Sequence, residues 1–428
     1  MTQEDTMLDP KFIRENIEVV AKGAKDKGFP FSAEDFAKLY DSRSALLQET
    51  EELRRQRNEG SKAVKGAKDK EEREGLLAKM KEVGQSLSVK DKELKEVEEQ
   101  LKTLMLRVPS PASEDTPFGE TDADNKLVRT VGEKTEFGFK AKDHITLGKE
   151  LGIVDFERGT KVAGSRSYFL AGAGAELEWA IFSMALDLLR KRGYRQMTVP
   201  TLVRSATMEG TGYLPIGANE AYHIEKDDLW LVGTSEVSLA SYHSGEILEK
   251  DQLPVKMAAF SPCYRREAGA HGKDTKGLYR VHQFQKIEQV ILCEPNIEQS
   301  DALHKELLQN AEDLLQMLEL PYQVMAVCTG DLGLGQVKKH DIETWMPSRE
   351  KYGETHSCSS FYDFQSRRLK IRVRDENGKP QLVYTLNNTA VANTRVILAF
   401  LENHQTEDGN VRIPKALQPY LGGRELLV

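Results

Sequence analysis

Charged and polar side chains recur at every second position between residues 260 and 292, where an ordinary core strand would carry apolar residues. The pattern predicts two strands joined by a long loop with several glycines and lysines. Successive side chains of a strand point to opposite faces, so residues two apart share a face. The alternating residues are Arg265, Glu267, Arg280, His282, Phe284, Lys286 and Glu288. Such a face predicts a binding surface for a flat, charged ligand.

Three arginines are candidates for holding phosphate groups: Arg265, Arg280 and Arg395. The chain contains neither G-x-G-x-x-G nor G-x-x-x-x-G-K-[ST], so a Rossmann or P-loop nucleotide site is not predicted. Side chains must then bind the phosphates, and the planar guanidinium matches phosphate oxygens well. Each arginine alone is more often a surface ion pair, but their occurrence together favours phosphate binding.

Glu354 and Ser357 could supply oxygen ligands to Mg²⁺, which usually takes only one or two protein groups beside phosphates. Their odd spacing does not place both on one face of a flat strand, so a bulge or bend is required.

The four cysteines are scattered without metal-ligand spacing. This argues against a structural zinc and a disulfide framework, and it suits a reducing cytosol.

Residues 76–104 carry the clearest helical pattern in the chain. Apolar residues alternate steps of four and three, as at the a and d positions of a coiled coil, and only Lys90 interrupts them. A preceding helix is predicted from an N-cap at Ser32 to about Lys65, with leucines at steps of seven. The two helices predict an antiparallel hairpin about 45–50 Å long.

This hairpin could be an oligomerisation element or an arm that contacts RNA. Basic residues gather near its turn, whereas the second helix is acidic near its other end. The net charge of −8 predicts no global affinity for nucleic acid, so a basic tip would be a local site for a phosphate backbone. The alternative is that these lysines and arginines only solvate a long helix.

The segment 108–125, with several Pro, Ser and acidic residues, predicts a linker between residues 1–107 and a domain of residues 126–428. In that domain, helices are expected over 177–192, 297–319 and 387–405, and a hairpin over 367–386. Hairpin-joined strands with helices between them predict an α+β fold on a mainly antiparallel sheet. No stretch is apolar and long enough to predict a membrane span, and the first residues lack signal-peptide order, which predicts a cytoplasmic protein.

The motifs YRREAG…RVHQFQKIE, GTSE, ETHSCSS and TLNNTAVANTRVILAFLENHQ together resemble those of the bacterial-type seryl-tRNA synthetases, class II enzymes. The likeness extends from MLDPKFIREN through the helical hairpin to the end of the chain. It implies a ligase that activates serine with ATP, releases pyrophosphate and transfers serine from seryl-adenylate to the 3′-hydroxyl of tRNA(Ser). The tRNA(Sec) would be a further substrate where it exists.

The resemblance implies that Arg265 and Arg395 are catalytic, holding the α-phosphate and the distal phosphates of a bent ATP. The ATP-binding residues that it implies are Arg265, Arg266, Glu267, Arg280, Val281, His282, Gln283, Phe284, Glu354, Thr355, His356, Ser357 and Arg395. Glu354 and Ser357 would bind Mg²⁺ together with ATP. No zinc is expected.

Serine-binding positions that match the family are Thr234, Ser235, Glu236, Arg265, Glu288 and Thr389. Contacts with tRNA are expected from Arg54, Arg55, Arg57, Lys62, Lys65, Lys273 and Lys276. The resemblance further implies a homodimer, with Pro200 in an interface strand, and no association with membranes.

The chain departs from the common family pattern at His356, Ser360, Asn393, Thr394 and Ser238. These departures put the local backbone and the ATP affinity in question, and none removes a residue with an assigned role.

Two other functions compete with that of a serine–tRNA ligase. A paralogue that passes the adenylate to a carrier protein would be expected to lack the arm, and a catalytically dead binding protein would not need the intact arginines and glutamates.

Overall fold

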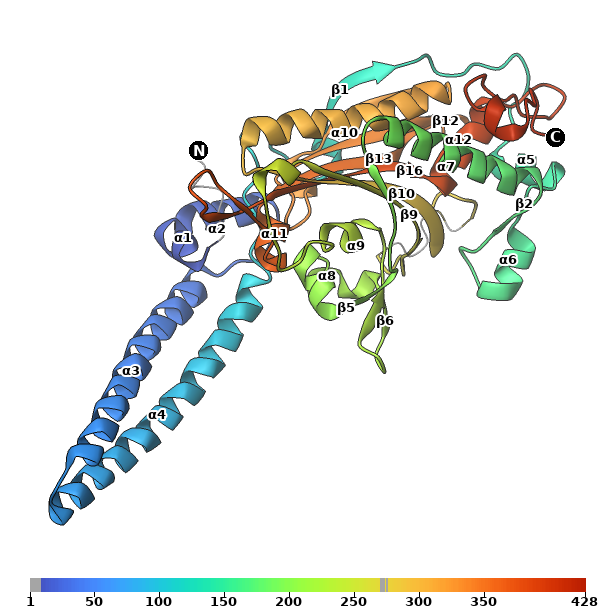
Figure 1. Cartoon of the computed structure of the whole chain (residues 1–428). Helices are drawn as coiled ribbons and strands as arrows, with labels where there is room; N and C mark the ends of the chain where they lie inside the picture. Colours follow the sequence, from blue (N-terminus) through green and yellow to red (C-terminus); the bar gives the residue numbers. More distant parts are fainter. Residues whose placement is uncertain (1–8, 270–273, 275) are drawn as a thin grey trace. The chain divides into compact units, whose positions relative to one another are not determined.

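The computed structural model of the chain describes residues 9–269, 274 and 276–428 (Figure 1). These residues form two compact units, one of residues 9–25 and 29–109 and the other of residues 26–28 and 110–428. Within the described ranges, no helix combines the length and the apolar character that a bilayer span requires.

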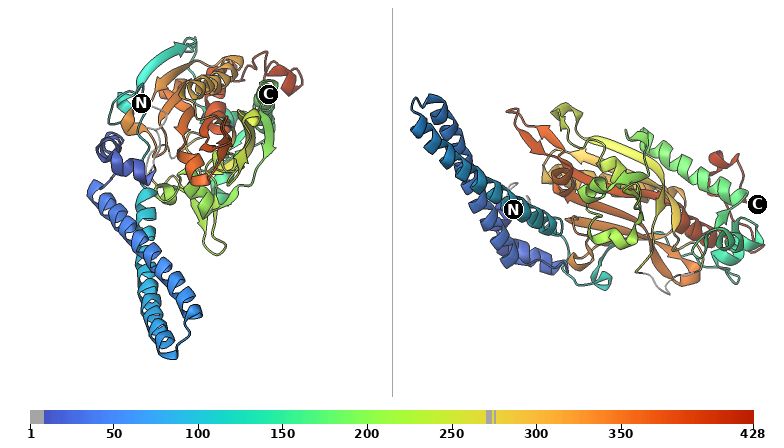
Figure 2. Two further views of the ribbon diagram at one scale, coloured as in Figure 1. Left: turned by 60° about the vertical axis from the view of Figure 1, so that its left-hand side comes forward. Right: turned by 90° about the horizontal axis from the view of Figure 1, so that it is seen from below.

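The N-terminal unit is helical, with α1 (Pro10–Glu15), α2 (Ile17–Asp26), α3 (Ala33–Gly66) and α4 (Lys70–Met105). Ser32 caps α3 by accepting a hydrogen bond from the Asp35 amide, and Asp69 caps α4 in the same way. Helices α3 and α4 lie side by side as a hairpin in both views (Figures 1 and 2). The predicted arm is therefore present, with its turn at residues 67–69.

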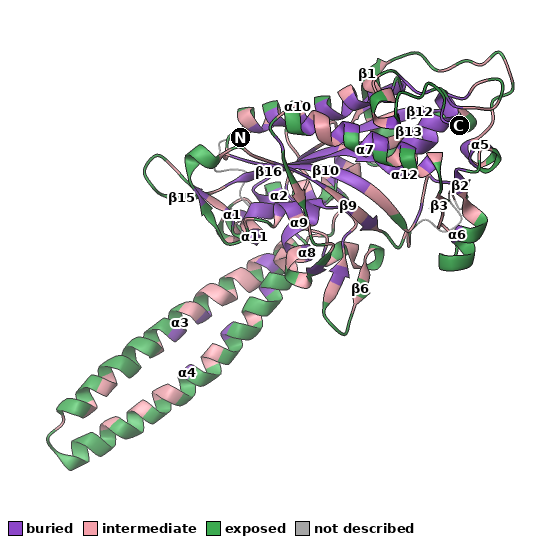
Figure 3. Cartoon of the chain, turned by 45° about the vertical axis from the view of Figure 1, so that its right-hand side comes forward, coloured by how far each residue is buried: buried purple, intermediate pink, exposed green. Residues whose placement is uncertain are grey.

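The seam between the two long helices is the predicted one. Leu87, Leu94 and Leu101 of α4 are buried, as is Leu46 of α3, whereas most of the remaining arm surface is exposed (Figure 3). Lys90, the polar interruption, forms ion pairs at 3.0 Å with Glu49 of the facing helix and with Glu93. A half-exposed lysine is tolerated in the seam because these carboxylates neutralise it.

The second unit is built on an eight-stranded sheet of order β1-β11-β12-β13-β16-β10-β9-β4. Among the pairs of this eight-stranded sheet, β4 and β9 are parallel and the others are antiparallel, which confirms the predicted α+β fold on a mainly antiparallel sheet. The strands are β1 (Lys126–Val131), β4 (Arg195–Thr198), β9 (Val255–Tyr264), β10 (Gln283–Cys293), β11 (Tyr322–Ala326), β12 (Lys338–Met346), β13 (Lys351–Tyr362) and β16 (Tyr384–Ala392).

Different elements cover the two faces of this sheet (Figure 1). Helices α7 (Ala173–Lys191), α10 (Ile297–Met317) and α12 (Asn393–Asn403) pack on one face. On the other lie α8 (Ser205–Thr211), α9 (Glu236–Ala240) and a small sheet of β5 (Leu202–Arg204), β6 (Tyr222–Ile224) and β7 (Leu229–Leu231). The remaining helices and strands are α5 (His144–Glu150), β2 (Val154–Asp155), α6 (Phe156–Ala163), β3 (Phe169–Leu170), β8 (Ile247–Leu248), α11 (Phe364–Leu369), β14 (Arg372–Arg374) and β15 (Pro380–Leu382).

Strand β10 shows how the sequence separates core from site. Ile287 and Ile291 face the helices α7, α10 and α12, whereas Val290 and Leu292 join a second apolar cluster on the opposite face. This second face continues toward the beginning of the strand with the charged residues Glu288 and Lys286 and the aromatic ring of Phe284. The alternation predicted from the sequence thus holds inside β10, whereas Arg280 and His282, also expected in this strand, precede it.

Two predictions in the C-terminal part are wrong. Residues 387–392, expected at the start of the last helix, complete strand β16, and α12 begins only at Asn393. Residues 367–369, expected in a hairpin strand, end helix α11, so the hairpin consists of β14 and β15 alone. All nine residues of β16 are buried, so this strand shows no polar alternation in the sequence.

A buried histidine next to α12 should make stability depend on pH. His404 Nε2 donates to the carbonyl of Leu318 (2.8 Å) and Nδ1 accepts from Arg412 (3.2 Å). Burial lowers the pKa of His404 to about 4 from 6.5. The unfolded chain therefore binds a proton here at a higher pH than the folded chain. The stabilisation is complete above pH 6.5 and declines as the pH falls toward 4.

We expect His404→Gln to remove this dependence, because its amide can donate to the same carbonyl but does not titrate. Between pH 8 and pH 5, the free energy of unfolding of the wild type should fall by about 2 kcal/mol more than that of the variant. Urea unfolding at both pH values measures this difference. Equal changes in the two proteins would contradict the assignment.

Candidate active site

A pocket opens on the polar face of β10, where β13, β16 and the first turn of α12 converge on it. Its walls contain residues from segments far apart in the sequence. They are Tyr213, Thr234, Glu236, Arg265, Glu267, Tyr279, Arg280, Val281, Phe284, Lys286, Glu288, Gln336, Lys339, Glu354, Thr355, His356, Ser357, Ser359, Asn387, Thr389, Ala392, Thr394 and Arg395.

One end of the pocket carries three arginines around two aromatic rings. The Arg265 guanidinium lies 5.3 Å from the centre of the Phe284 ring. Arg280 donates to Glu267 Oε2 at 2.6 Å. Glu267 follows the end of β9 and has a φ of +53°, a left-handed conformation that is uncommon outside glycine. Strand β9 ends at Tyr264, so Arg265 and Glu267 lie beyond the strand, although both line the pocket.

Arg395 is held rigidly at the start of α12. Its Nη1 donates to the Glu354 carbonyl (2.7 Å) and carboxylate (3.2 Å), and its Nε donates to the Tyr279 carbonyl (3.1 Å). Burial lowers the pKa of Arg395, but the Glu354 carboxylate outweighs this and raises it. The guanidinium is therefore a fixed positive charge, suited to bind anionic oxygens that replace Glu354.

The required irregularity between Glu354 and Ser357 is present. His356 pairs with Ile342 and Glu354 pairs with Glu343, so β13 contains one extra residue, Thr355, opposite β12. This bulge brings both Glu354 and Ser357 into the pocket wall. Burial alone raises the pKa of Glu354, but Arg395 and further cations lower it, so the carboxylate is ionised. Among the described residues, no group of three or more His, Cys, Asp or Glu is arranged to hold a metal.

The other end of the pocket contains two buried carboxylates. Glu236, the first residue of α9, accepts hydrogen bonds from the Tyr213 hydroxyl (2.9 Å) and the Gln365 amide (2.7 Å). Glu288 accepts from the hydroxyls of Thr234 (3.4 Å) and Thr389 (3.5 Å).

Burial, followed by the nearby charge of Glu288, raises the pKa of Glu236 to about 7. Glu288 is also paired with the buried amine of Lys286. An additional cation bound here would stabilise the ionised form of Glu236 and lower its pKa again. This end is therefore suited to a small ligand that carries an ammonium group.

Most of the residues expected in the site line this pocket, but four do not. The Arg266 guanidinium lies over the Tyr222 ring at 5.9 Å, and the His282 imidazole contacts the carbonyl of Arg265 at 3.0 Å. Gln283 lines a different pocket on the opposite side of β10. The Ser235 hydroxyl is buried and donates to the carbonyl of Ala259 (3.3 Å).

The basic residues expected to contact tRNA are all on the surface where the structure describes them. Their side chains are exposed at Arg54, Arg55, Arg57, Lys62, Lys65 and Lys276, and Lys273 lies outside the described residues. Arg54 is partly neutralised by Asp91 (2.8 Å), and Arg55 by Glu52 (2.9 Å).

Several pocket residues had been assigned no role in binding ATP or serine. Lys286 shares the strand face of Phe284 and Glu288, and the alternation placed it on the predicted binding surface without a specific role. Asn387 shares a face with Thr389, a relation hidden by the wrongly predicted helix. Tyr213 and Lys339 come from distant segments that no local pattern connects to the site.

The departures from the family pattern have different positions. His356 and Thr394 line the pocket, and burial lowers the pKa of His356 to about 4. The Asn393 amide oxygen accepts from the backbone of Gln285 (2.9 Å). Ser238 donates to the carbonyl of Pro200 (2.6 Å), and Ser360 contacts Ser300 (3.3 Å), so these two serines have structural contacts.

Comparison with known proteins agrees with this arrangement. Residues 7–111 match the seryl-tRNA synthetase N-terminal domain, and residues 221–404 match the tRNA synthetase class II core domain (G, H, P, S and T). The chain is 44% identical to the serine–tRNA ligase of Rubrobacter xylanophilus (98% of this chain, 99% of the relative) and 45% identical to that of Deinococcus radiodurans (98% and 99%). A crystal structure of seryl-tRNA synthetase from Pyrococcus horikoshii complexed with ATP has a TM-score of 0.90 at 38% identity, covering 99% of both chains.

Proposed function

This chain belongs to the seryl-tRNA synthetase family of class II aminoacyl-tRNA synthetases, and from that membership we propose how its pocket performs the reaction. The chain is a serine–tRNA ligase that joins serine to AMP and then transfers it to tRNA. Of the competing functions, the carrier-protein paralogue is disfavoured by the complete arm, and the dead binding protein by the intact polar pocket.

ATP would bind at the arginine-lined end of the pocket. In this proposal, adenine stacks on Phe284 while Glu267 accepts a hydrogen bond from its amino group. Arg265 binds the α-phosphate, and Arg395 binds the distal phosphates with assistance from Arg280. The ion pairs Arg280–Glu267 and Arg395–Glu354 support this, because they hold the guanidinium groups ready to exchange carboxylate oxygens for phosphate oxygens.

Serine would bind at the end with the two carboxylates. Glu236 and Glu288 would neutralise its ammonium group, and Thr234 and Thr389 would contribute hydroxyls. The serine carboxylate then lies toward Arg265 and attacks the α-phosphorus, and pyrophosphate leaves. Charge on the phosphoryl oxygens increases during this step, and Arg265 stabilises it without any protein nucleophile.

Glu354 and Ser357 fit a Mg²⁺ bound together with ATP, because an ionised carboxylate and a hydroxyl oxygen face the same pocket. Such an ion would neutralise phosphate charge.

In the second step, the 3′-hydroxyl of the terminal adenosine of tRNA(Ser) attacks the seryl carbonyl, and AMP leaves.

We assign tRNA binding to the basic tip of the arm and to Lys276, and we extend it to tRNA(Sec) where that tRNA exists. We further infer a cytoplasmic homodimer in which the arm of one subunit presents tRNA to the other. We also infer a linker of residues 108–125 between a tRNA-binding domain of residues 1–107 and a class II catalytic domain of residues 126–428.

One observation carries this proposal: a single pocket has buried carboxylates at one end and fixed arginines at the other. We expect serine-dependent exchange of pyrophosphate into ATP. Alanine should support little exchange, because its lack of a hydroxyl leaves buried polar groups unpaired, at a cost of about 10⁴-fold or more in kcat/KM. Threonine should be rejected less strongly, because only its extra methyl group excludes it. Absence of exchange with every amino acid would contradict the proposal.

A further inference from the structure

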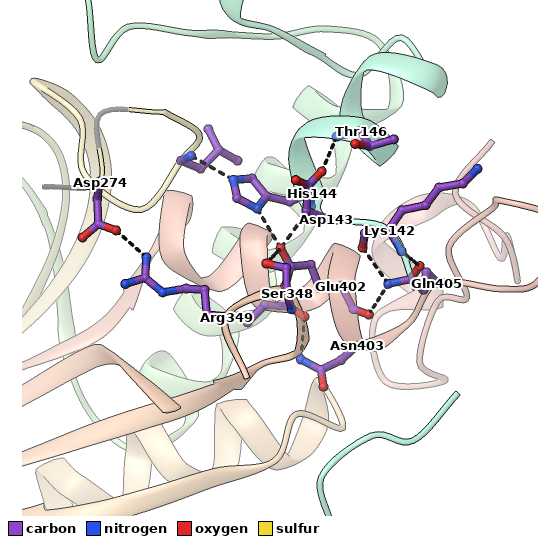
Figure 4. Close-up of polar contacts among 12 residues, drawn as sticks. Lys142, Asp143, His144, Thr146, Asp274, Ser348, Arg349, Glu402, Asn403 and Gln405 are labelled. Atoms are coloured by element: carbon purple, nitrogen blue, oxygen red, sulfur yellow. Dashed lines mark hydrogen bonds and ion pairs between the residues drawn. The ribbon is translucent and has the colours of Figure 1, made fainter. Parts of the chain in front are cut away.

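A hydrogen-bonded network outside the pocket holds the segment through which the chain re-enters β10 (Figure 4). His144, the first residue of α5, is only 7% exposed. Its Nδ1 lies 2.7 Å from Glu402 Oε1, and its Nε2 accepts a hydrogen bond from the backbone amide of Leu278 at 3.1 Å. One imidazole thus connects a carboxylate of α12 to the main chain of the return segment, Lys276 to Arg280.

The partners of Glu402 determine where the protons of this histidine lie. Burial raises the pKa of Glu402, but hydrogen bonds from His144 and Ser348 outweigh it and lower the pKa. The ionised carboxylate also accepts from the Ser348 amide (2.9 Å) and hydroxyl (2.7 Å). His144 Nδ1 must therefore carry a proton, and Nε2 offers a lone pair to the Leu278 amide.

The contact requires a glycine beside it. Gly277 has a φ of +80°, and an added Cβ would overlap with His144 Nε2 and lie near Ile145. A left-handed conformation and this close approach both exclude larger residues. The ring and the main chain are therefore fitted to one another, which distinguishes the contact from an incidental surface hydrogen bond.

The segment held in this way provides two residues of the pocket wall, Tyr279 and Arg280. The guanidinium groups of Arg349 and Arg395 lie 3.8 Å and 4.5 Å from the centre of the Tyr279 ring. The Tyr279 carbonyl also accepts from Arg395 Nε (3.1 Å). A shift of Leu278 would therefore displace Arg280 and remove a support of Arg395.

Helix α12 connects both parts of the network. Arg395 and Glu402 are seven residues apart, which places them on the same helix face two turns from one another. Beside Ser348, Arg349 contacts the Tyr279 ring, so the same short turn supports the return segment a second time. Arg349 also forms an ion pair at 2.8 Å with Asp274, which precedes that segment.

We propose that His144, oriented by Glu402, is a positioning residue for ATP, although it does not line the pocket. It fixes the Leu278 amide, so that Arg280 faces the phosphates and the Tyr279 carbonyl keeps Arg395 aimed at them. This inference rests on the proposed function, because it concerns the ATP end of that site.

The test compares His144→Ala with His144→Gln in serine-dependent ATP–pyrophosphate exchange. The alanine variant loses both hydrogen bonds, and we expect kcat/KM for ATP to fall by about 10- to 100-fold. KM for serine should stay within about twofold. The glutamine amide spans a similar distance to the two ring nitrogens, so it can donate to Glu402 and accept from Leu278, and it should restore most of the activity.

Hydrogen exchange gives a readout that does not depend on activity. The Leu278 amide should exchange faster in His144→Ala than in the wild type, and nearly as slowly in His144→Gln as in the wild type. His304→Asn is the matched control, because His304 is a buried histidine that contacts His340 (2.9 Å) rather than the return segment. It should lower stability without changing KM for ATP or exchange at Leu278.

An unchanged KM for ATP and unchanged Leu278 exchange in His144→Ala would overturn the inference. The inference would also be overturned if both His144→Ala and His304→Asn lowered kcat/KM for ATP and for serine by equal factors. Such a result would indicate a general structural effect. If the wild type itself catalysed no exchange, the proposed function would fail instead, and the hydrogen-exchange result would still report on the network.

Discussion

Arg265→Ala should reduce serine-dependent ATP–pyrophosphate exchange by about 10³-fold or more while the protein remains folded. Arg265 lines the pocket with its guanidinium 5.3 Å from the centre of the Phe284 ring, and it would bind the α-phosphate there. Removal of one group that stabilises developing charge in an active site costs about 10²- to 10³-fold, and the loss of a full positive charge should cost at least this much. Exchange kinetics at saturating serine measure the effect, and thermal unfolding checks the fold.

The neighbouring residue supplies a matched control. Arg266 is the next residue in the connection between β9 and β10, but its guanidinium lies over the Tyr222 ring and does not line the pocket. Arg266→Ala should therefore keep exchange within about threefold of the wild type, a loss of under 1 kcal/mol. If both variants lost exchange activity equally, the effect would come from the whole connection between β9 and β10. The assignment of the α-phosphate to Arg265 would then be wrong.

A shortened arm should separate the two steps of the reaction. Replacement of residues 55–86 by a short glycine–serine linker removes the turn but keeps the ion pairs Glu49–Lys90 and Arg43–Glu98 between the remaining helices. The pocket lies in the other compact unit, so exchange should stay within about twofold of the wild type, whereas aminoacylation of tRNA should fall by about 10²-fold or more because phosphate contacts are lost. Normal charging of tRNA by this variant would show that the arm is only structural.

A charge-matched pair of variants tests the reason for that loss. Neutralisation of Arg57, Lys62 and Lys65 by glutamine should weaken tRNA binding and reduce the slope of log Kd against log salt concentration by about 2 to 3. The same change at three other exposed lysines of the arm, Lys92, Lys95 and Lys102, should have little effect. Equal effects of the two variants would indicate net charge rather than a local site.

The sequence was most informative where a single face of an element is polar. The alternation of Phe284, Lys286 and Glu288 predicted both the strand and the side of the sheet that carries the pocket. The spacing of Glu354 and Ser357 required a bulge, and one is present at Thr355. The a/d pattern of α4 predicted the arm, because an isolated hairpin can bury only that one stripe.

Prediction failed where burial or distance removes the local signal. Strand β16 is central and buried on both faces, so its polar residues, such as Asn387, follow no visible alternation, and the apolar spacing around Val391 resembles a helix. The hydrogen bonds of Glu236 with Tyr213 and Gln365 join three segments that only the tertiary fold brings together. Glu267 likewise has a left-handed conformation and a contact with Arg280 that no local sequence pattern predicts.

Lys90 gives the arm a further property, because it determines the register of the two long helices. The other seam positions are apolar and would tolerate a slip of one heptad, but the slip would place Lys90 opposite Ser42 or Gln56 instead of Glu49. Each alternative leaves an amine in the seam without its cross-helix carboxylate, which opposes the slip. With a single register the arm has a constant length. Lys90, although far from the pocket, would thereby fix how far along a bound RNA the basic tip extends.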